Sequence, residues 1–460
     1  MLEQCDKQMN HISVMLGVSK SLGWGFFLAG SIAAFAQTAV VPQNPVVPQG
    51  GEFSVLGAIR GDQVLPSISL SPSAGVIAWQ DNVVDKNGSG IGGSMLNSSF
   101  GAGPIFGANK TATGNQINSK VQLLANDAIL FVWQSTVAGT PDIYARVTKP
   151  TTTKVETVIT NGATKKTETS TTSSYGTNFG TIDLRVNTYT KDQQVDPAVA
   201  ALPDGSAIIT WSSYGQDGSM WGVFARKISS KGAFSPAKEF QVNQYTQYNQ
   251  RKPAVATLAN GDFVIAWVSE QERYYNSVDI YARVFTPAGK PDTSVNGGDE
   301  IAVNSTSNIC DTPDIAPLND GGFTIVWAQK NLSMPSYGWD IWGRAFSASG
   351  SPEVADFPIN TYLNGDQYRP KIAAGPSGSL VVWTSMAQDG SREGVYGRFL
   401  QGGTAAAGSE MLVNTTTISQ QLHPAVAWNG VNNFLVVWTS FVGASGFDLY
   451  GQAFSLNTSQ

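Results

Sequence analysis

Tryptophan recurs at a near-constant spacing along most of the chain, and this repeat limits the folds that the sequence can adopt. Successive copies lie 54, 78, 56, 60, 56 and 55 residues apart, so a single interval is enlarged. A period of this size is typical of one supersecondary unit per repeat, with each unit stacked against its neighbours. The seven residues are Trp79, Trp133, Trp211, Trp267, Trp327, Trp383 and Trp438.

Each repeat contains the same four strand-like segments. The first has a Pro-x-Val-Ala pattern (residues 197–200), and the second is an apolar run that ends in the tryptophan (263–267). The third is an aromatic residue followed by a small residue and arginine (281–283), and the fourth contains Val-Asn (242–243). Turns such as Asp204-Gly205 separate the first two segments, which therefore form a tight antiparallel hairpin.

Four strands in each of seven repeats predict an all-β fold, a seven-bladed β-propeller of four-stranded antiparallel blades. Stacking the sheets around an axis buries both faces of each and leaves short, protected edges. Composition agrees, because 48 glycines and only 13% charged residues favour short strands joined by tight turns. A solenoid, the alternative, needs polar caps on its terminal repeats, and the sequence shows none.

The two ends of the repeat region predict how the ring closes. Residues 52–55 match the fourth segment at 239–242, and residues 449–454 form a third segment with no fourth segment after it. If the Pro-x-Val-Ala strand is innermost, the N-terminal strand completes the last blade. If the Val-Asn strand is innermost, the same sequence makes seven self-contained blades.

The N-terminal region resembles a targeting signal and not part of the fold. Lys7 and Lys20 precede an apolar run at 22–35 that ends in an Ala-x-Ala pattern, so we expect cleavage after Ala36 and secretion to an extracellular or periplasmic location. An uncleaved anchor helix is the alternative, and the short run disfavours it. The predicted divisions are a signal peptide (1–36), a linker (37–50), the propeller (51–456) and a tail (457–460).

Two regions depart from the repeat. The enlarged interval holds an insertion at about 149–181, where Asn161-Gly162 between β-prone runs predicts an extruded hairpin, with disorder as the alternative. The third segment of the first repeat is degenerate, within the Gly-rich stretch 91–106.

The composite repeat resembles the tandem repeats of bacterial secreted and cell-surface proteins predicted to be propellers. Its best copies are Gln-Asp-Gly-Ser at 216–219 and at 388–391, and the resemblance covers the chain from about Glu52 to the end. It implies the architecture and a bacterial source, and it carries no named catalytic motif.

Strand alternation predicts the binding face. The loops between the second and third segments, and between the fourth and the next first segment, emerge on the same face. Aromatic rings among amides and carboxylates suit the faces and hydroxyls of sugars, and also suit protein partners. The candidate ligand-binding residues are Tyr214, Gln216, Asp217, Trp221, Tyr245, Tyr248, Tyr274, Tyr275, Tyr337, Trp339, Tyr368, Gln388 and Asp389.

No linear motif for a metal, a cofactor or a nucleophile is found, so the sequence predicts no catalytic residue, cofactor or metal site. Calcium at Asp217 and Asp389 is the weaker alternative to plain turns. Cys310 is the only cysteine after Ala36 and takes the place of a glutamine found in other repeats, so we interpret it as structural. A net charge of -6 argues against nucleic acid as a partner.

These observations favour a secreted, non-enzymatic recognition module that binds a glycan or a surface protein and has no membrane span. A structural subunit of an extracellular assembly, with self-association, is the alternative. The third alternative is a propeller glycoside hydrolase, in which two carboxylates from distant repeats meet across the central channel.

Overall fold

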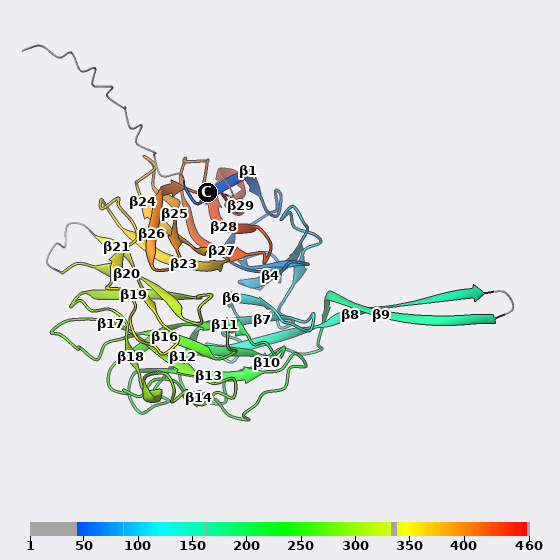
Figure 1. The fold of residues 1–460 in the computed structure, drawn as a ribbon, viewed down its shortest axis with the longest axis horizontal. Helices are drawn as coiled ribbons and strands as arrows, with labels where there is room; N and C mark the ends of the chain where they lie inside the picture. The colour runs from blue at the N-terminus through cyan, green and yellow to red at the C-terminus, as the bar shows by residue number, and fades with distance from the viewer. Residues whose placement is uncertain (1–43, 86, 162–163, 333–337, 458–460) are drawn as a thin grey trace, which may run out of the picture. The chain divides into compact units, whose positions relative to one another are not determined.

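The structure is a computed structural model that describes residues 44–457 except residues 86, 162–163 and 333–337. The expected signal peptide lies outside the described residues, as does Tyr337. The described chain folds into seven antiparallel sheets, so the predicted all-β, seven-bladed propeller is confirmed (Figure 1). The described residues contain no helix with the length and hydropathy of a membrane span.

Blades 1 to 3 follow the chain in order. Blade 1 contains β2 (Gln63–Leu70), β3 (Gly75–Asp81), β4 (Gly90–Leu96) and β5 (Phe106–Gly107). Blade 2 contains β6 (Gln116–Leu123), β7 (Ile129–Ser135), β8 (Asp142–Asn161) and β10 (Leu184–Arg185), with β9 (Thr164–Phe179) paired to β8. Blade 3 contains β11 (Gln194–Ala201), β12 (Ala207–Tyr214), β13 (Trp221–Ile228) and β14 (Phe240–Gln241).

Blades 4 to 7 repeat the pattern. Blade 4 contains β15 (Gln250–Thr257), β16 (Phe263–Ser269), β17 (Asp279–Phe285) and β18 (Ile301–Ala302), with the short helix η1 (Asn296–Gly298). Blade 5 contains β19 (Ile309–Pro317), β20 (Phe323–Lys330), β21 (Trp339–Phe346) and β22 (Phe357–Pro358). Blade 6 contains β23 (Gln367–Gly375), β24 (Gly378–Met386), β25 (Glu393–Gln401) and β26 (Ala405–Leu412). Blade 7 contains β27 (Gln421–Trp428), β28 (Asn433–Phe441), β29 (Phe447–Leu456) and β1 (Val46–Ser54), with η3 (Gly443–Ser445).

The Pro-x-Val-Ala strand is the innermost strand of each blade. The first strands of neighbouring blades contact one another all the way round the ring, including β2 with β27. β1 pairs antiparallel with β29, from Val46 opposite Leu456 to Ser54 opposite Tyr450. The predicted closure, in which the N-terminal strand completes the last blade, is therefore confirmed.

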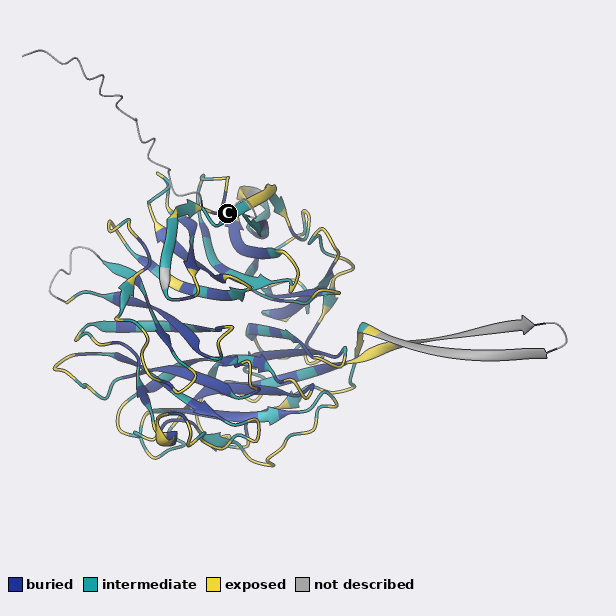
Figure 2. Cartoon of the chain, viewed as in Figure 1, coloured by how far each residue is buried: buried dark blue, intermediate teal, exposed yellow. Residues whose placement is uncertain are grey.

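The repeated tryptophans form the contacts between blades. Each lies in the second strand of its blade and is fully buried, with at most 1% of its surface exposed. Trp327 of blade 5, for example, packs in one apolar cluster with Val264 and Ile280 of blade 4. Trp79 of blade 1 packs with Leu435 of blade 7, so the same kind of contact joins the first and last blades of the ring. Buried residues accordingly follow the strands, and exposed residues follow the loops (Figure 2).

The third-strand arginines also join neighbouring blades. Arg344 donates from Nη1 to the Val303 carbonyl of the preceding blade at 2.8 Å, and Arg398 donates to the Ile359 carbonyl at 2.8 Å. Both acceptors belong to the Val-Asn segments. The asparagine that follows each acceptor binds its own blade, since Asn360 Oδ1 accepts from the Ile341 amide at 2.6 Å. The constant spacing of these arginines and asparagines is therefore explained by the hydrogen bonds that they make to backbone groups.

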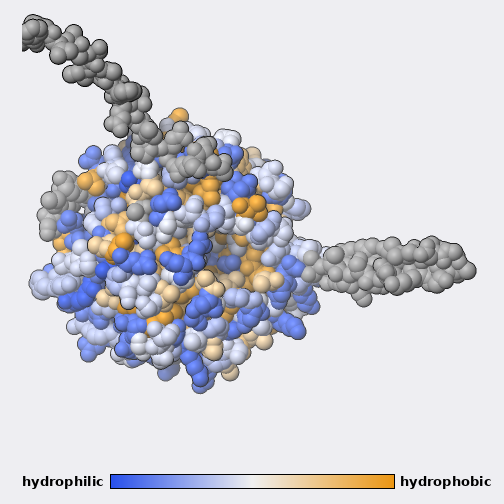
Figure 3. Space-filling view, in the orientation of Figure 1, coloured by the Kyte–Doolittle hydropathy of each residue, from blue (hydrophilic) through white to orange (hydrophobic). Residues whose placement is uncertain are grey.

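β8 continues beyond its blade to pair with β9, the register running from Thr148 opposite Phe179 to Asn161 opposite Thr164 (Figure 1). Phe179, near the base of this pair, packs against Phe106 and Phe131. Over the face in view, hydrophobic and hydrophilic residues are interspersed (Figure 3).

Candidate functional site

Every inner strand carries a β-bulge near its start. In each blade the pairing of the first strand with the second shifts register, as between Val195 and Ala198 in β11. Within each shift lies one residue with left-handed backbone, and none of the seven is glycine. They are Leu65 (φ 55°), Asn118 (53°), Asp196 (55°), Lys252 (53°), Thr312 (49°), Arg369 (53°) and His423 (56°).

All seven of these left-handed residues line one cavity of about 890 Å³ at the centre of the ring. A bulge inserts an extra residue and re-aims its side chain, so the same device in each blade directs one side chain toward the axis. Trp339, Asp366 and Met386 also line the cavity, and they belong to the loops of the predicted binding face and the strand ends beside them.

Left-handed backbone is unfavourable for residues other than glycine, by about 1–2 kcal/mol each, so the surrounding structure has to hold it. Hydroxyl groups of the preceding blade supply part of that support. The Lys252 amide donates to Ser212 Oγ at 2.9 Å, and the His423 amide donates to Thr384 Oγ1 at 3.2 Å. The Leu65 amide donates to Thr439 Oγ1 at 3.2 Å across the closure. Packing between blades thus fixes where the cavity residues stand.

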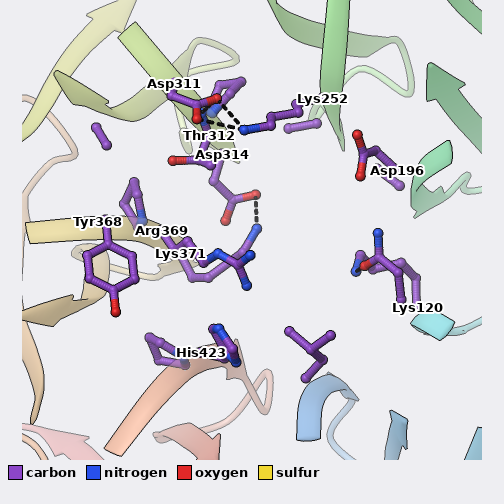
Figure 4. A pocket seen from close by; sticks show the side chains of 18 of the residues that line it. Lys120, Asp196, Lys252, Asp311, Thr312, Asp314, Tyr368, Arg369, Lys371 and His423 are labelled. Carbon is purple, nitrogen blue, oxygen red and sulfur yellow. Dashed lines mark hydrogen bonds and ion pairs between the residues drawn. The ribbon is translucent and has the colours of Figure 1, made fainter. Parts of the chain in front are cut away.

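Besides Asp366, three carboxylates line the cavity, and these three come from the inner strands of two blades (Figure 4). Asp311 and Asp314 come from β19, and Asp196 comes from β11 on a different wall. Asp311 pairs with Lys252 at 2.6 Å, and Asp314 pairs with Lys371 at 3.4 Å. Two of these inner-strand carboxylates are therefore paired with lysines, and Asp196 has no ion pair within 4.0 Å among the described residues.

Burial perturbs the ionisation of several cavity residues. It raises the pKa of Asp196, although Lys252 and Lys120 oppose the shift. It lowers the pKa of Lys120 to about 7, and the positive charge of Lys371 adds to the shift. Titratable groups with such shifts, gathered in one cavity, are typical of catalytic sites.

His423 and Tyr368 complete the polar lining. Burial lowers the pKa of His423 to about 4, and the nearby Arg369 charge contributes, so the imidazole is neutral at neutral pH. Burial raises the pKa of Tyr368, which keeps its hydroxyl protonated. The cavity can therefore supply both proton donors and proton acceptors near neutral pH.

The glutamines at the start of the inner strands support the loops of this face. Gln250 Nε2 donates to the Gln247 carbonyl at 2.8 Å, and Gln367 Nε2 donates to the Asn364 carbonyl at 3.1 Å. Cys310 occupies the same position in blade 5, where it is buried and its Sγ lies 3.6 Å from Gln329 Oε1. Burial raises the pKa of the Cys310 thiol well above its usual value, which disfavours the reactive thiolate. Among the described residues no group of three or more His, Cys, Asp and Glu side chains could hold a metal ion.

The predicted ligand-binding residues are divided between the cavity and the surrounding loops. Of those described, only Trp339 and Tyr368 line the cavity. Four tyrosines lie exposed on loops or at strand ends and remain candidate contacts for a longer ligand: Tyr214, Tyr248, Tyr274 and Tyr275. Tyr245 and Trp221 are half-buried, and the Trp221 ring lies edge-on to Tyr214 at 5.2 Å.

The repeated Gln-Asp pairs make contacts within the scaffold. Gln216 Nε2 donates to Glu239 at 3.1 Å, and Gln388 Nε2 donates to Glu410 at 2.8 Å. Asp217 and Asp389 each accept from a backbone amide two residues further on, at 3.1 and 3.0 Å. These side chains hold turns and strand ends in place.

The charged residues of the cavity were not predicted, although the sequence contains a signal for them. Six of the seven left-handed residues directly precede a proline, and the exception is Asn118. The glutamine that lies three positions before the proline in most inner strands was used only to align the repeats. The variable residue before the proline, charged or imidazole in blades 3, 4, 6 and 7, marks the cavity.

No family model and no curated protein sequence matches this chain. Its fold is similar to that of the polysaccharide lyase Uly1, with a TM-score of 0.54 and 10% identity over 87% of this chain and 91% of that one. Penicillium chrysogenum alpha-L-arabinanase gives a TM-score of 0.45 and 11% identity over 74% of this chain and 93% of that one. The GH93 alpha-L-arabinofuranosidase of Fusarium graminearum gives 0.43 and 11% over 74% and 92%.

The prediction of a non-enzymatic recognition module, or else an assembly subunit, is contradicted, because the neighbour Uly1, which shares this fold, is a polysaccharide lyase. The physical reason for the error is that aromatic loop residues were weighted over the carboxylates, which meet only when β11 and β19 are brought to the same cavity.

Proposed function

We propose that this chain is a glycan-cleaving enzyme that hydrolyses glycosidic bonds in the central cavity. The observation that carries the proposal is the convergence of Asp196, Asp311 and Asp314 on that cavity, with burial raising the pKa of Asp196. Glycoside hydrolysis needs two carboxyl groups on either side of the bond, one protonated and one charged.

The environments of the three carboxyl groups suggest their roles. Asp196, whose pKa is raised by burial, is the general acid that protonates the leaving oxygen. Asp311 and Asp314 are the candidates for the charged group that activates water or attacks the sugar. Lys252 and Lys371 pair with these two carboxylates, which lie on a wall of the cavity different from that of Asp196 (Figure 4).

A second candidate reaction, elimination, is favoured by Lys120. Its pKa of about 7 supplies a neutral amine that can remove the proton beside a sugar carboxylate, while Tyr368 protonates the leaving oxygen as the C–O bond breaks. The similarity of the fold to a polysaccharide lyase supports testing this reaction alongside hydrolysis.

The test is cleavage of a panel of neutral and acidic polysaccharides, measured by the release of reducing ends. Asp196→Asn should lower the rate by about 100- to 10,000-fold, which is the usual contribution of a general acid. Asp320→Asn is the matched control, because Asp320 is exposed in the turn before β20 and accepts a hydrogen bond from the Gly322 backbone amide at 2.9 Å.

Three outcomes of this experiment are informative. Full activity in Asp196→Asn would overturn the assignment of that residue, and a folded wild-type protein that cleaves no glycan would overturn the proposed function. Ultraviolet absorbance from a carbon–carbon double bond in the product would identify elimination and reject hydrolysis.

We also propose that the protein is secreted, since the N-terminal sequence to Ala36 has the pattern of a cleaved signal. Expression of the full chain in a bacterium should release a protein that begins at Gln37. N-terminal sequencing of the exported protein checks this cleavage site, and retention of the uncleaved chain inside the cell would refute it.

A further inference from the structure

Some of the charged groups that line the cavity form no ion pair with another described residue. Of the carboxylates in the lining, Asp311 and Asp314 each pair with a lysine ammonium. Arg369 projects from β23 and is exposed to the cavity, yet it makes no hydrogen bond and no ion pair with any described residue. An unpaired guanidinium offers five N–H donors to a ligand.

The groups near Arg369 include two cations, Lys120 and Lys371, while the carboxylates of Glu393 and Asp366 act on the adjacent Tyr368. Lys371 lies two residues further along β23, and Lys120 faces both from β6, with its nearest contacts to Asn118 Oδ1 at 2.7 Å and the Ser119 carbonyl at 3.3 Å. His423 lies near Arg369 on β27, and its Nδ1 is buried with no hydrogen-bond partner among the described residues. Tyr368 and Lys371 share the strand of Arg369, and Lys371 pairs with Asp314 (Figure 4).

This arrangement contrasts with the rest of the protein. The chain as a whole has a net charge of -6. A group of basic side chains that includes an unpaired guanidinium therefore differs in charge from the protein as a whole. Arg369 and His423 each occupy the left-handed bulge position of their blade, which directs both toward the cavity. Bidentate hydrogen bonding by arginine is the common way in which proteins bind carboxylate and other oxyanions.

We infer that Arg369, with His423 near it and Lys120 across the cavity, binds an anionic substituent of the glycan, a carboxylate or a sulfate ester. The substrate class is therefore an acidic polysaccharide. This inference rests on the proposed function for its turnover measurements, but ligand binding alone can also test it.

The experiment compares the wild type with Arg369→Gln on matched substrates. These are a uronate-containing polysaccharide, the same polymer with its carboxyl groups reduced, a sulfated polysaccharide, and that polymer after desulfation. The wild type should prefer one acidic polymer to its neutral counterpart. Arg369→Gln should raise KM for that polymer by about 10- to 100-fold, as expected for a lost charged hydrogen bond, with little effect on the neutral form.

Two controls keep the result interpretable. Lys231→Gln removes a positive charge from an exposed turn outside the cavity, so it should leave the preference unchanged. Arg369→Lys should restore part of the affinity, since it returns the charge without the bidentate geometry. Thermal melting of each variant confirms that it is folded.

Several outcomes would overturn the inference. Equal cleavage of acidic and neutral polymers by the wild type would do so, as would an equal loss on both in Arg369→Gln. If no polymer is cleaved, the proposed function fails, and calorimetric titration with acidic and neutral oligosaccharides still decides the inference. The carboxyl-reduced and desulfated polymers show which anion is recognised.

Discussion

Seven equivalent residues share one backbone conformation and differ in chemistry. Thr312 and Leu65 are neutral, Asp196 is acidic, and Arg369 and Lys252 are basic, yet all have φ between 49° and 55°. Because the bulge and the preceding blade fix the backbone, a change of side chain at such a position alters the cavity without altering the ring. The conformation cannot be read from the residue type, since threonine and leucine both disfavour it.

At the same scale, His423 should make stability depend on pH. Its pKa falls from 6.5 to about 4 on folding, so below pH 6.5 the unfolded chain binds a proton that the folded chain does not. The free energy of unfolding should therefore decrease as the pH falls from about 6.5 to about 4, by up to about 3 kcal/mol. Urea unfolding of the wild type and His423→Gln at several pH values measures this contribution.

The comparison between the two proteins isolates the histidine from the carboxyl groups that titrate in the same range. The difference in unfolding free energy between wild type and variant should change between pH 7 and pH 4, and level off below pH 4. A difference that is constant over this range would show that His423 is readily protonated in the folded protein.

At the scale of elements, the sequence predicts most of the blade. The apolar runs into tryptophan locate the second strands, because a residue buried against the preceding blade in every repeat keeps its identity and spacing. The third strand of blade 1 was predicted only as a degenerate stretch, and it is β4. Gly92 replaces the usual aromatic residue there because the Trp79 ring occupies the space, and a Cβ would lie 2.2 Å from it.

The candidate site is less predictable than the strands for a physical reason. Asp196 and Asp311 belong to blades 3 and 5, and no linear spacing reports that inner strands of a closed ring face one cavity. The loop tyrosines were accessible to sequence analysis because strand alternation assigns loops to faces. The charged residues inside strands could not be predicted in this way, because only the bulge in each inner strand directs them toward the axis.

At the scale of the whole molecule, ring closure should dominate stability. Val46 of β1 is buried, and the strand completes blade 7 along the edge of β29. Deleting residues 44–54 should lower the free energy of unfolding by about 2–4 kcal/mol, from lost apolar burial, and expose the β29 edge. Thermal melting and chemical unfolding of the deletion variant measure this effect.

A synthetic peptide of residues 43–54 provides the control for that deletion, because an extended peptide can pair with an open strand edge. Adding it should raise the melting temperature of the deletion variant in a concentration-dependent way and leave the full-length protein unchanged. A deletion variant as stable as the full chain would mean that β1 does not fasten the ring.

The pairing of β1 with β29 also sets the order of events during synthesis. Val46 is translated before the other six blades and its partner Leu456 after them, so the seventh blade cannot form until all six have been translated. Until then β1 has no strand to pair with, and a chain that stops short of β29 never acquires one. Completion of the fold therefore requires translation through β29, and a product that ends before β29 stays recognisable to proteases by its open ring.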